Sequence, residues 1–160
     1  EESEEMPMGQ GRFSYFLCAA LDGGAADVLG NVGVIGAYAY LRESFGAGEQ
    51  TPTFKCNVAK LHRLRRCYPA VSREEMMRLP DLFDADPAFR MPLNPSYERT
   101  APQPDPVQVE PFGMLQRYRA AKLVEPVDVP HMYDAAMASK SCRLTALGRH
   151  YRHLADRKLL

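Results

Sequence analysis

Residues 28–41 read VLGNVGVIGAYAYL, an apolar run with glycines at positions 30, 33 and 36. A phosphate-binding loop, a membrane-spanning helix and a closely packed helix are the three interpretations of this run. The glycines recur at every third residue with no Lys after them, which matches neither a dinucleotide-binding fingerprint nor a P-loop. A membrane span needs about 20 apolar residues, whereas the run has fourteen residues between Asp27 and Arg42 and includes Asn31.

The remaining interpretation is a helix over residues 25–45 that packs closely against a neighbour. Each Gly inside a helix costs about 0.5–1 kcal/mol relative to Ala, so three of them imply a compensating close approach of backbones. We expect the partner to be a helix over residues 12–22, turned back at Gly23 and Gly24, or a helix of another chain. Contact with lipid beside a larger membrane protein is the alternative. The predicted packing residues are Gly30, Gly33 and Gly36.

Charge is segregated along the chain although the net charge is zero. Residues 1–11 and 80–111 are acidic, and residues 54–78 and the part after Pro111 are basic. A neutral chain has no bulk attraction to nucleic acid or to an anionic membrane, while opposite blocks can pair with one another or with other subunits. We expect an acidic protein to contact the basic block at Arg63, Arg65 and Arg66, because few aromatic residues flank the block to stack on bases. Phosphate is the alternative ligand.

The basic block is predicted to be helical over residues 54–68, since Val58, Leu61 and Leu64 recur at helical spacing before Pro69. After it, Ser72 and Glu75 have the S-x-x-E spacing of a capping box, which predicts a short helix through Met76 and Leu79.

Residues 80–111 contain eight of the thirteen prolines, so we expect neither a long helix nor a central strand there. The first half is too apolar for a solvated linker. We predict an extended arm that lies on a partner protein, with its own domain as the alternative surface. The predicted anchors are Phe83, Phe89, Met91 and Tyr97.

The last third predicts a small α+β unit. Residues 110–122 are expected to form a helix with Met114, Leu115 and Tyr118 inward, followed by a strand at 123–127, a helix at 130–139 and a strand at 141–145. Thr145 is the predicted N-cap of a final helix with Leu147, Tyr151, Leu154 and Ala155 inward.

The segments RYRAAKLVEPV and SCRLTALGRHYRHL resemble the closing half of winged-helix domains, over roughly residues 110–157. In that family a helix ends in a short turn, and a wing strand leads into a terminal helix. The chain departs from the family where PHMYDAAMAS replaces a plain wing and where the proline-rich segment precedes the helix. The resemblance implies DNA binding through Arg143, Arg149, Arg152 and Arg157.

The histidines and cysteines are the candidates for catalytic or metal-binding roles. His150 and His153 are three residues apart on the expected final helix, with no carboxylate motif beside them, and His131, Ser141 and Cys142 complete the candidates for an enzyme site. Cys56, His62 and Cys67 could form a metal site only with a fourth ligand. We therefore predict no catalytic residue, no metal and no cofactor, and reduced thiols at Cys18, Cys56, Cys67 and Cys142.

The sequence as a whole predicts a mainly α, α+β protein: an acidic tail (1–11), a helical region with an N-terminal hairpin (12–79), a proline-rich arm (80–111) and a winged-helix-like unit (112–160). The predicted function is a non-enzymatic accessory subunit of a large multi-protein complex, associated with an organellar membrane such as the mitochondrial inner membrane with its respiratory chain. Its partners would be other subunits, with possible peripheral membrane contact. The alternatives are a nucleic-acid-binding module, a ribosome-associated protein and a small enzyme.

Overall fold

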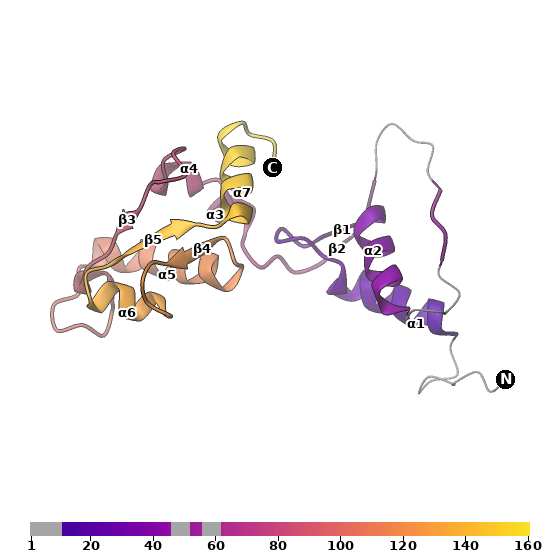
Figure 1. The fold of residues 1–160 in the computed structure, drawn as a ribbon, viewed down its shortest axis with the longest axis horizontal. Helices are drawn as coiled ribbons and strands as arrows, with labels where there is room; N and C mark the ends of the chain where they lie inside the picture. The colour runs from indigo at the N-terminus through magenta and orange to yellow at the C-terminus, as the bar shows by residue number, and fades with distance from the viewer. Residues whose placement is uncertain (1–10, 46–51, 56–61) are drawn as a thin grey trace. The chain divides into compact units, whose positions relative to one another are not determined.

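The computed structural model of the chain describes residues 11–45, 52–55 and 62–160 (Figure 1). It confirms a mixed α+β protein, with helices and two small antiparallel sheets. The chain divides into two compact units, Glu1–Pro69 (unit 1) and Ala70–Leu160 (unit 2). This boundary differs from the expected ones, which placed residues 70–79 with the N-terminal helices and separated residues 80–111 from the C-terminal unit.

Unit 1 contains two short helices that contact each other and a two-stranded sheet. Helix α1 (Arg12–Ala19) continues into a π-helical turn, η1 (Ala20–Gly24), in which Gly23 has a φ of 122°. This stop at the glycine pair is as predicted. Strand β1 (Asn31–Gly33) leads directly into α2 (Val34–Ser44), and β2 (Arg63–Arg66) pairs antiparallel with β1.

Two helix predictions in unit 1 are wrong in part. The expected helix over 25–45 begins only at Val34, because the chain turns at Gly30, which has a φ of 78°. The expected helix over 54–68 has a strand at 63–66, while Val58 and Leu61 lie outside the described residues. The amide of Cys67 donates a 2.7 Å hydrogen bond to the Gly30 carbonyl, and pairing between distant segments overrides local helical periodicity.

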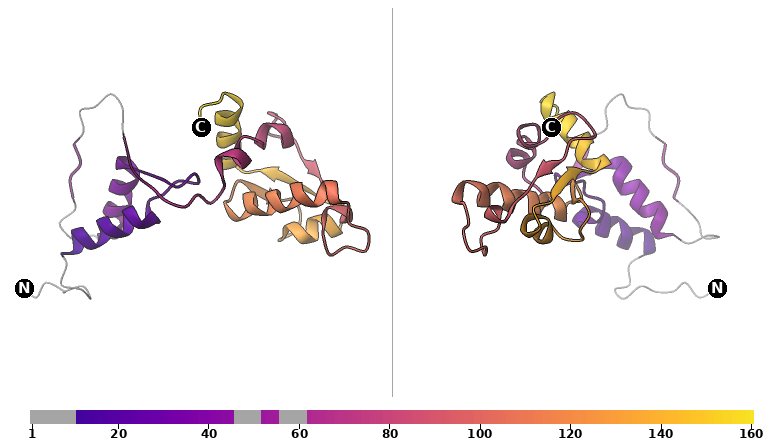
Figure 2. Two further views of the ribbon diagram at one scale, coloured as in Figure 1. Left: turned by 180° about the vertical axis from the view of Figure 1, so that it is seen from behind. Right: turned by 60° about the vertical axis from the view of Figure 1, so that its left-hand side comes forward.

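Unit 2 is built on a three-stranded antiparallel sheet in the order β3-β5-β4. Two short helices precede β3, and α7 packs against both of them as well as against β5 (Figures 1 and 2). The helix, strand, helix, strand, helix order predicted for the last third is confirmed. The elements in chain order are α3 (Arg73–Met76), α4 (Leu79–Leu82), β3 (Met91–Pro92), η2 (Pro95–Tyr97), α5 (Pro106–Ala120), β4 (Val124–Pro126), α6 (Met132–Met137), β5 (Ser141–Leu144) and α7 (Ala146–Asp156).

Side-chain caps define the starts of three α-helices in unit 2. Ser72 and Glu75 form the predicted capping box on α3, and Thr145 accepts the Gly148 amide of α7 at 3.0 Å, also as predicted. Asp105 caps α5 by accepting the Val107 amide at 3.0 Å. Each cap satisfies an amide that has no partner inside the helix and typically contributes about 1 kcal/mol.

Residues 80–111 fold as part of unit 2, which agrees with the alternative that this segment lies on its own domain. The predicted extended conformation is wrong, because the segment contains helical elements. Three of its prolines lie at the starts of helices, Pro80 in the first turn of α4, Pro95 at the start of η2 and Pro106 at the start of α5, while Pro111 lies inside α5. Proline is tolerated at the start of a helix because the first amides lack an internal partner in any case. Pro92 lies in β3 at the edge of the sheet, where proline is also accepted.

The core of unit 2 is made of large side chains and tight backbone contacts. At Gly148 a side chain would overlap the backbone of Leu123, so α7 lies directly on the chain entering β4. Tyr151 and Ala155 of α7 are buried as predicted, whereas Leu147 is exposed. The largest fully buried side chains of the unit are Val71, Met76, Leu79, Phe83, Met114, Leu115, Tyr118, Leu123, Val124 and Cys142.

Candidate interaction surfaces

The three glycines predicted to pack against a partner differ in their surroundings. A side chain at Gly30 would overlap the Cys67 carbonyl, and one at Gly36 would come within 3.1 Å of the Ala25 carbonyl oxygen. Both close approaches are therefore made inside unit 1. Nothing described lies within 4 Å of a side chain at Gly33.

The three arginines predicted to meet an acidic partner lie together on β2, whose four residues are all exposed. Arg65 forms a 2.7 Å ion pair with Asp22, and Arg63 donates a 3.0 Å hydrogen bond to the side-chain oxygen of Asn31. No described residue pairs with the Arg66 side chain. Sequence reasoning found the arginines but missed Asp22 and Asn31, because the turn signal at Gly30 was interpreted as helical.

The four predicted arm anchors lie within unit 2. Phe83 is only 2% exposed and packs edge-to-face with Phe89, with ring centroids 6.3 Å apart. Tyr97 is half-buried and meets Phe112 in the same geometry at 6.1 Å. Met91 is half-buried in β3. The burial of Phe83 corrects its prediction as a partner anchor, because its ring already fills the core of its own unit.

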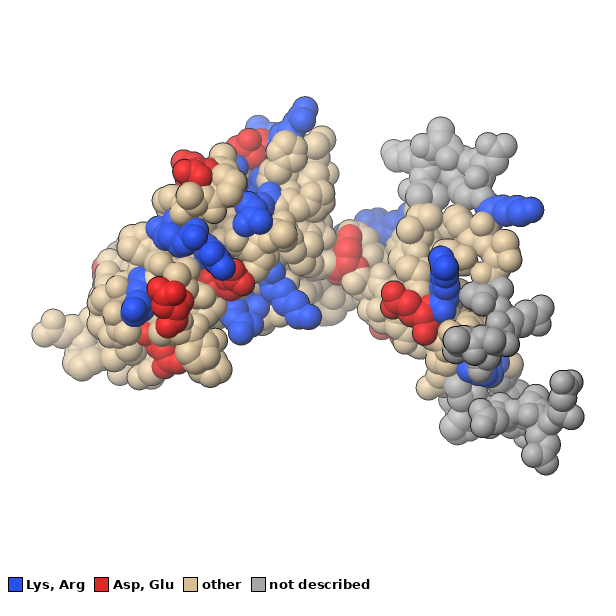
Figure 3. Space-filling model, in the orientation of Figure 1, with Lys and Arg blue, Asp and Glu red and all other residues tan. Residues whose placement is uncertain are grey.

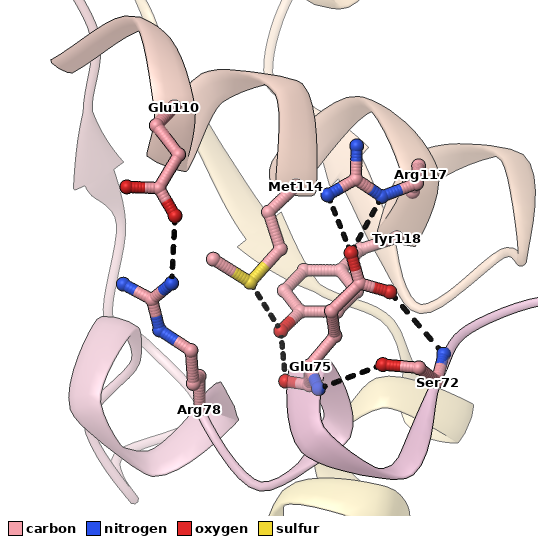
Figure 4. Close-up of polar contacts among 7 residues, drawn as sticks. All are labelled: Ser72, Glu75, Arg78, Glu110, Met114, Arg117 and Tyr118. Carbon is pink, nitrogen blue, oxygen red and sulfur yellow. Dashed lines mark hydrogen bonds and ion pairs between the residues drawn. The ribbon is translucent and has the colours of Figure 1, made fainter.

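A polar network joins α3 to α5 (Figure 4). The Arg117 guanidinium donates to the Glu75 carboxylate, with Nε 2.7 Å from Oε1, and the Tyr118 hydroxyl donates to the Glu75 carbonyl and contacts Met114. Arg78 of the basic block pairs with Glu110 of the acidic block at 3.1 Å. The opposite charge blocks thus pair with each other inside unit 2.

Titration of this network is shifted by its surroundings. Burial raises the pKa of Glu75, but hydrogen bonds from Arg117 and from the Ser72 amide outweigh burial, so the net pKa lies below 4.5. Burial, followed by the nearby Glu75 carboxylate, raises the pKa of the Tyr118 hydroxyl. Both groups therefore keep their neutral-pH charge state over a widened pH range. Glu75 and Tyr118 hold α3 on α5, and their bonding partners are other groups of unit 2.

The residues considered for an enzyme site do not gather. Cys142 is fully buried, and burial raises the pKa of its thiol to about 12, whereas His131, His150 and His153 are exposed. Among the described residues, no group of three His, Cys, Asp or Glu side chains could hold a metal ion. Cys56 of the possible metal site lies outside the described residues.

Two open hollows border the strands β4 and β5 and share Glu125 and Thr145. One, of about 350 Å³, is lined also by Arg119 and Lys122, and the other, of about 290 Å³, by Arg143 and Arg149. Arg143 forms a 2.6 Å ion pair with Glu125. Each lining has two cationic side chains against the single carboxylate of Glu125, so both linings carry an excess of positive charge. Acidic and basic side chains are intermingled over the face of unit 2 in Figure 3. The hollows could accept an anionic group.

The sequence did not predict Arg119 and Lys122 as site residues, because only the fold brings the end of α5 and the turn after it to the hollow. Arg143 and Arg149 were predicted as phosphate contacts through the winged-helix resemblance.

In the described part of the chain, no helix has the length and apolar character needed to cross a membrane. No protein-family model, curated protein or solved structure matches this chain.

Proposed function

We propose that the chain is a non-catalytic subunit of a larger protein assembly, with unit 1 as its main docking element. The observation that carries the proposal is the composition of the unit 1 surface and core. Its buried cluster is Ala20, Val32 and Ala37, and Leu41 is the one leucine side chain buried in the described part of the unit. Four large apolar side chains are between 41% and 51% exposed: Phe13, Tyr15, Ile35 and Leu64.

Small buried side chains remove little apolar area from water, and each Å² of apolar area buried stabilises the fold by about 25 cal/mol. The exposed aromatic and branched side chains offer further area that only a partner can bury, and aromatic residues are enriched in such contacts. Unit 2 also exposes large apolar side chains such as Val107, Tyr133 and Leu159, but it has a core of many fully buried large side chains. Unit 1 should therefore gain more stability from docking than unit 2. A mitochondrial, membrane-associated assembly belongs to the same proposal and rests on the sequence alone.

The test is the native mass of the full chain extracted from its source in mild detergent, with identification of the co-migrating proteins. We expect stoichiometric co-migration for the wild type and its loss in a variant combining Phe13→Ser, Tyr15→Ser and Ile35→Ser. The matched control is Val107→Ser in unit 2, which removes a side chain that is 78% exposed and should leave co-migration unchanged. A wild-type chain that migrates as a free monomer would refute the proposal.

A second candidate function, nucleic-acid binding, is favoured by the unit 2 topology. The sheet order β3-β5-β4, with α5 before β4 and α7 after β5, adds a first strand to the winged-helix resemblance, while α6 lies between β4 and β5 where those domains have a plain wing. The resemblance is one of topology, and fold alone does not give function. Arg119, Lys122 and Arg149 would be the phosphate contacts.

Duplex DNA binding of the full chain over a salt series distinguishes this second function. Each phosphate contact contributes about 0.9 to the slope of log affinity against log salt. Arg119→Glu with Lys122→Glu should then lower both the affinity and the slope, and Arg99→Glu, an exposed site between η2 and α5, is the control. Absence of salt-dependent binding would eliminate this candidate.

A further inference from the structure

We infer that the outer edge of β2 accepts an extended, acidic segment of a partner protein as a third strand of the β1–β2 sheet. This inference rests on the proposed function and names the partner chemistry for one face of unit 1. The binding mode is strand addition, in which backbone hydrogen bonds give affinity and side chains give selectivity.

The hydrogen bonds of β1 establish which backbone groups of β2 point outward. In an antiparallel pair, opposed residues alternate between those that exchange hydrogen bonds and those that do not. Cys67 bonds to Gly30 at 2.7 Å, so the next pair, Asn31 with Arg66, is of the second kind. The hydrogen bonds of Asn31 are consistent with this pairing. Its amide donates to the Asp27 side chain at 2.8 Å, and its carbonyl accepts from the Asp27 amide at 3.0 Å, so neither group bonds to β2.

By the same alternation, the amide and carbonyl of Arg66 point away from β1. On the β1 side, the turn at Asp27 occupies the equivalent groups of Asn31, which closes that edge. On the β2 side, the described part of unit 1 contains no third strand and no backbone partner of Arg66. Unpaired edge groups of this kind are a template for an incoming strand.

The side chains of β2 select the charge of that strand. Three of its four residues are arginines, and Leu64 is 51% exposed. A second copy of the strand would place like charges opposite each other, which is destabilising, whereas Glu or Asp opposite Arg is favourable. Two of the arginines keep contacts to Asn31 and Asp22, and Arg66 has no described partner. An acidic strand is therefore the complementary occupant.

The register limits the length of the added strand. Val32 pairs with Arg65 and Gly33 with Arg63, so Leu64 is skipped in the pairing with β1. An irregularity of this kind bends a strand and interrupts its ladder. Pairing should therefore centre on Arg66, with Leu64 offering an apolar contact at the end of the added segment.

The probe for this inference is a labelled ten-residue peptide of alternating Glu and Val, added to the full-length protein and followed by fluorescence anisotropy. The same peptide with Lys in place of Glu is the charge control. We expect binding of the acidic peptide alone, with amide chemical-shift changes confined to β2 and its neighbours. Equal binding of both peptides, or shift changes located in unit 2, would overturn the inference.

A pair of variants separates the backbone contribution from the charge. Arg66→Ala removes the charge and keeps the outward amide, while Arg66→Pro removes both and remains compatible with an edge strand. We expect Arg66→Pro to bind about 5-fold more weakly than Arg66→Ala, the effect of one lost hydrogen bond. Unchanged Val32 and Gly33 amide shifts would show that the β1–β2 pair persists in both variants.

Equal binding by the two variants would contradict strand addition. Concentration-dependent dimerisation that Arg66→Pro removes would identify a second copy as the occupant and overturn the acidic-partner assignment. The proposed function is tested separately: co-migration with an assembly, together with failure to bind the peptide, removes only this inference. A free monomer in the native extract removes the proposed function whatever the peptide does.

Discussion

Units 1 and 2 bury different kinds of side chain. The buried apolar side chains in the described part of unit 1 are Ala20, Val32, Ala37 and Leu41, with half-buried residues around them. Unit 2 buries aromatic, leucine and methionine side chains completely, and joins α3 to α5 through the Glu75 network. The difference teaches that unit 2 has a core of large side chains that can stabilise it alone, and it supports the proposal that unit 1 gains stability from a partner.

The largest expected effect is the loss of a core aromatic in unit 2. Phe83→Ala should destabilise the protein by about 3–5 kcal/mol, because it removes a ring that packs against Phe89 and leaves a cavity. Denaturant unfolding followed by circular dichroism measures this change. Phe13→Ala in unit 1, where the ring is exposed, should change the same transition by less than about 0.5 kcal/mol. Similar losses for both variants would remove the distinction between the units.

A backbone contact gives the next largest effect. Gly148→Ala places a methyl group on the Leu123 backbone and should cost about 1–3 kcal/mol through overpacking of α7. Gly113→Ala is the matched control, because its methyl would meet only the Arg117 side chain at 3.7 Å, and the better helix propensity of Ala should stabilise α5 by about 0.5–1 kcal/mol. Thermal unfolding of the two variants should therefore shift in opposite directions, and shifts of the same sign would contradict this packing.

The Glu75 network predicts a smaller, pH-dependent effect. A carboxyl whose pKa is lowered on folding contributes stability above its unfolded pKa, near 4.5, and that contribution disappears as the pH falls through the folded pKa. At pH 7, Glu75→Gln should cost about 0.5–1 kcal/mol, because Gln can keep the capping-box hydrogen bond but loses the ion pair with the half-exposed Arg117. The difference from wild type should vanish below the folded pKa of Glu75.

The control for that experiment is Glu74→Gln, at the exposed neighbouring position in the same helix. Its unfolding free energy should follow the wild-type pH curve closely. If Glu75→Gln and Glu74→Gln give the same curve, Glu75 does not hold α3 on α5 through its charge.

The smallest effect on global stability is expected in unit 1. Gly30→Ala should leave the unfolding of unit 2 unchanged, while it displaces the Cys67 backbone that lies against Gly30. Alkylation followed by mass spectrometry should then show faster labelling of Cys67. The Cys142 thiol, buried and with a pKa of about 12, should react at the wild-type rate. Faster labelling of Cys142 would show that the two units unfold together.

Local signals made much of unit 2 predictable. Ser72 and Thr145 cap their helices as the sequence indicates, and the strand at 141–144 follows from its own residues. The proline-rich segment was misread because proline stiffens an arm and begins a helix with the same local geometry. The pairing of Met91 with Cys142, which are 51 residues apart in sequence, distinguishes the two outcomes and is not visible in the local sequence.

Unit 1 was harder to predict because its sheet depends on distant pairing. The arginines of β2 lie at helical spacing from upstream apolar residues, and the glycines of residues 30–36 suit a packed helix as well as a turn followed by a strand. The positive φ of Gly30 and the bond from Cys67 select the strand. The candidate arginines were identified correctly as exposed cations, but their arrangement on one strand edge needed the tertiary structure.

Native-state hydrogen exchange of the isolated full-length protein tests the difference between the units most directly. Opening free energies differ across a protein according to local packing. Amides of α5, β5 and α7 should exchange only through global unfolding, and amides of α1, α2 and β1 through openings at least about 2 kcal/mol smaller. Equal protection in both units would contradict the account, because unit 1 would then be stable without a partner.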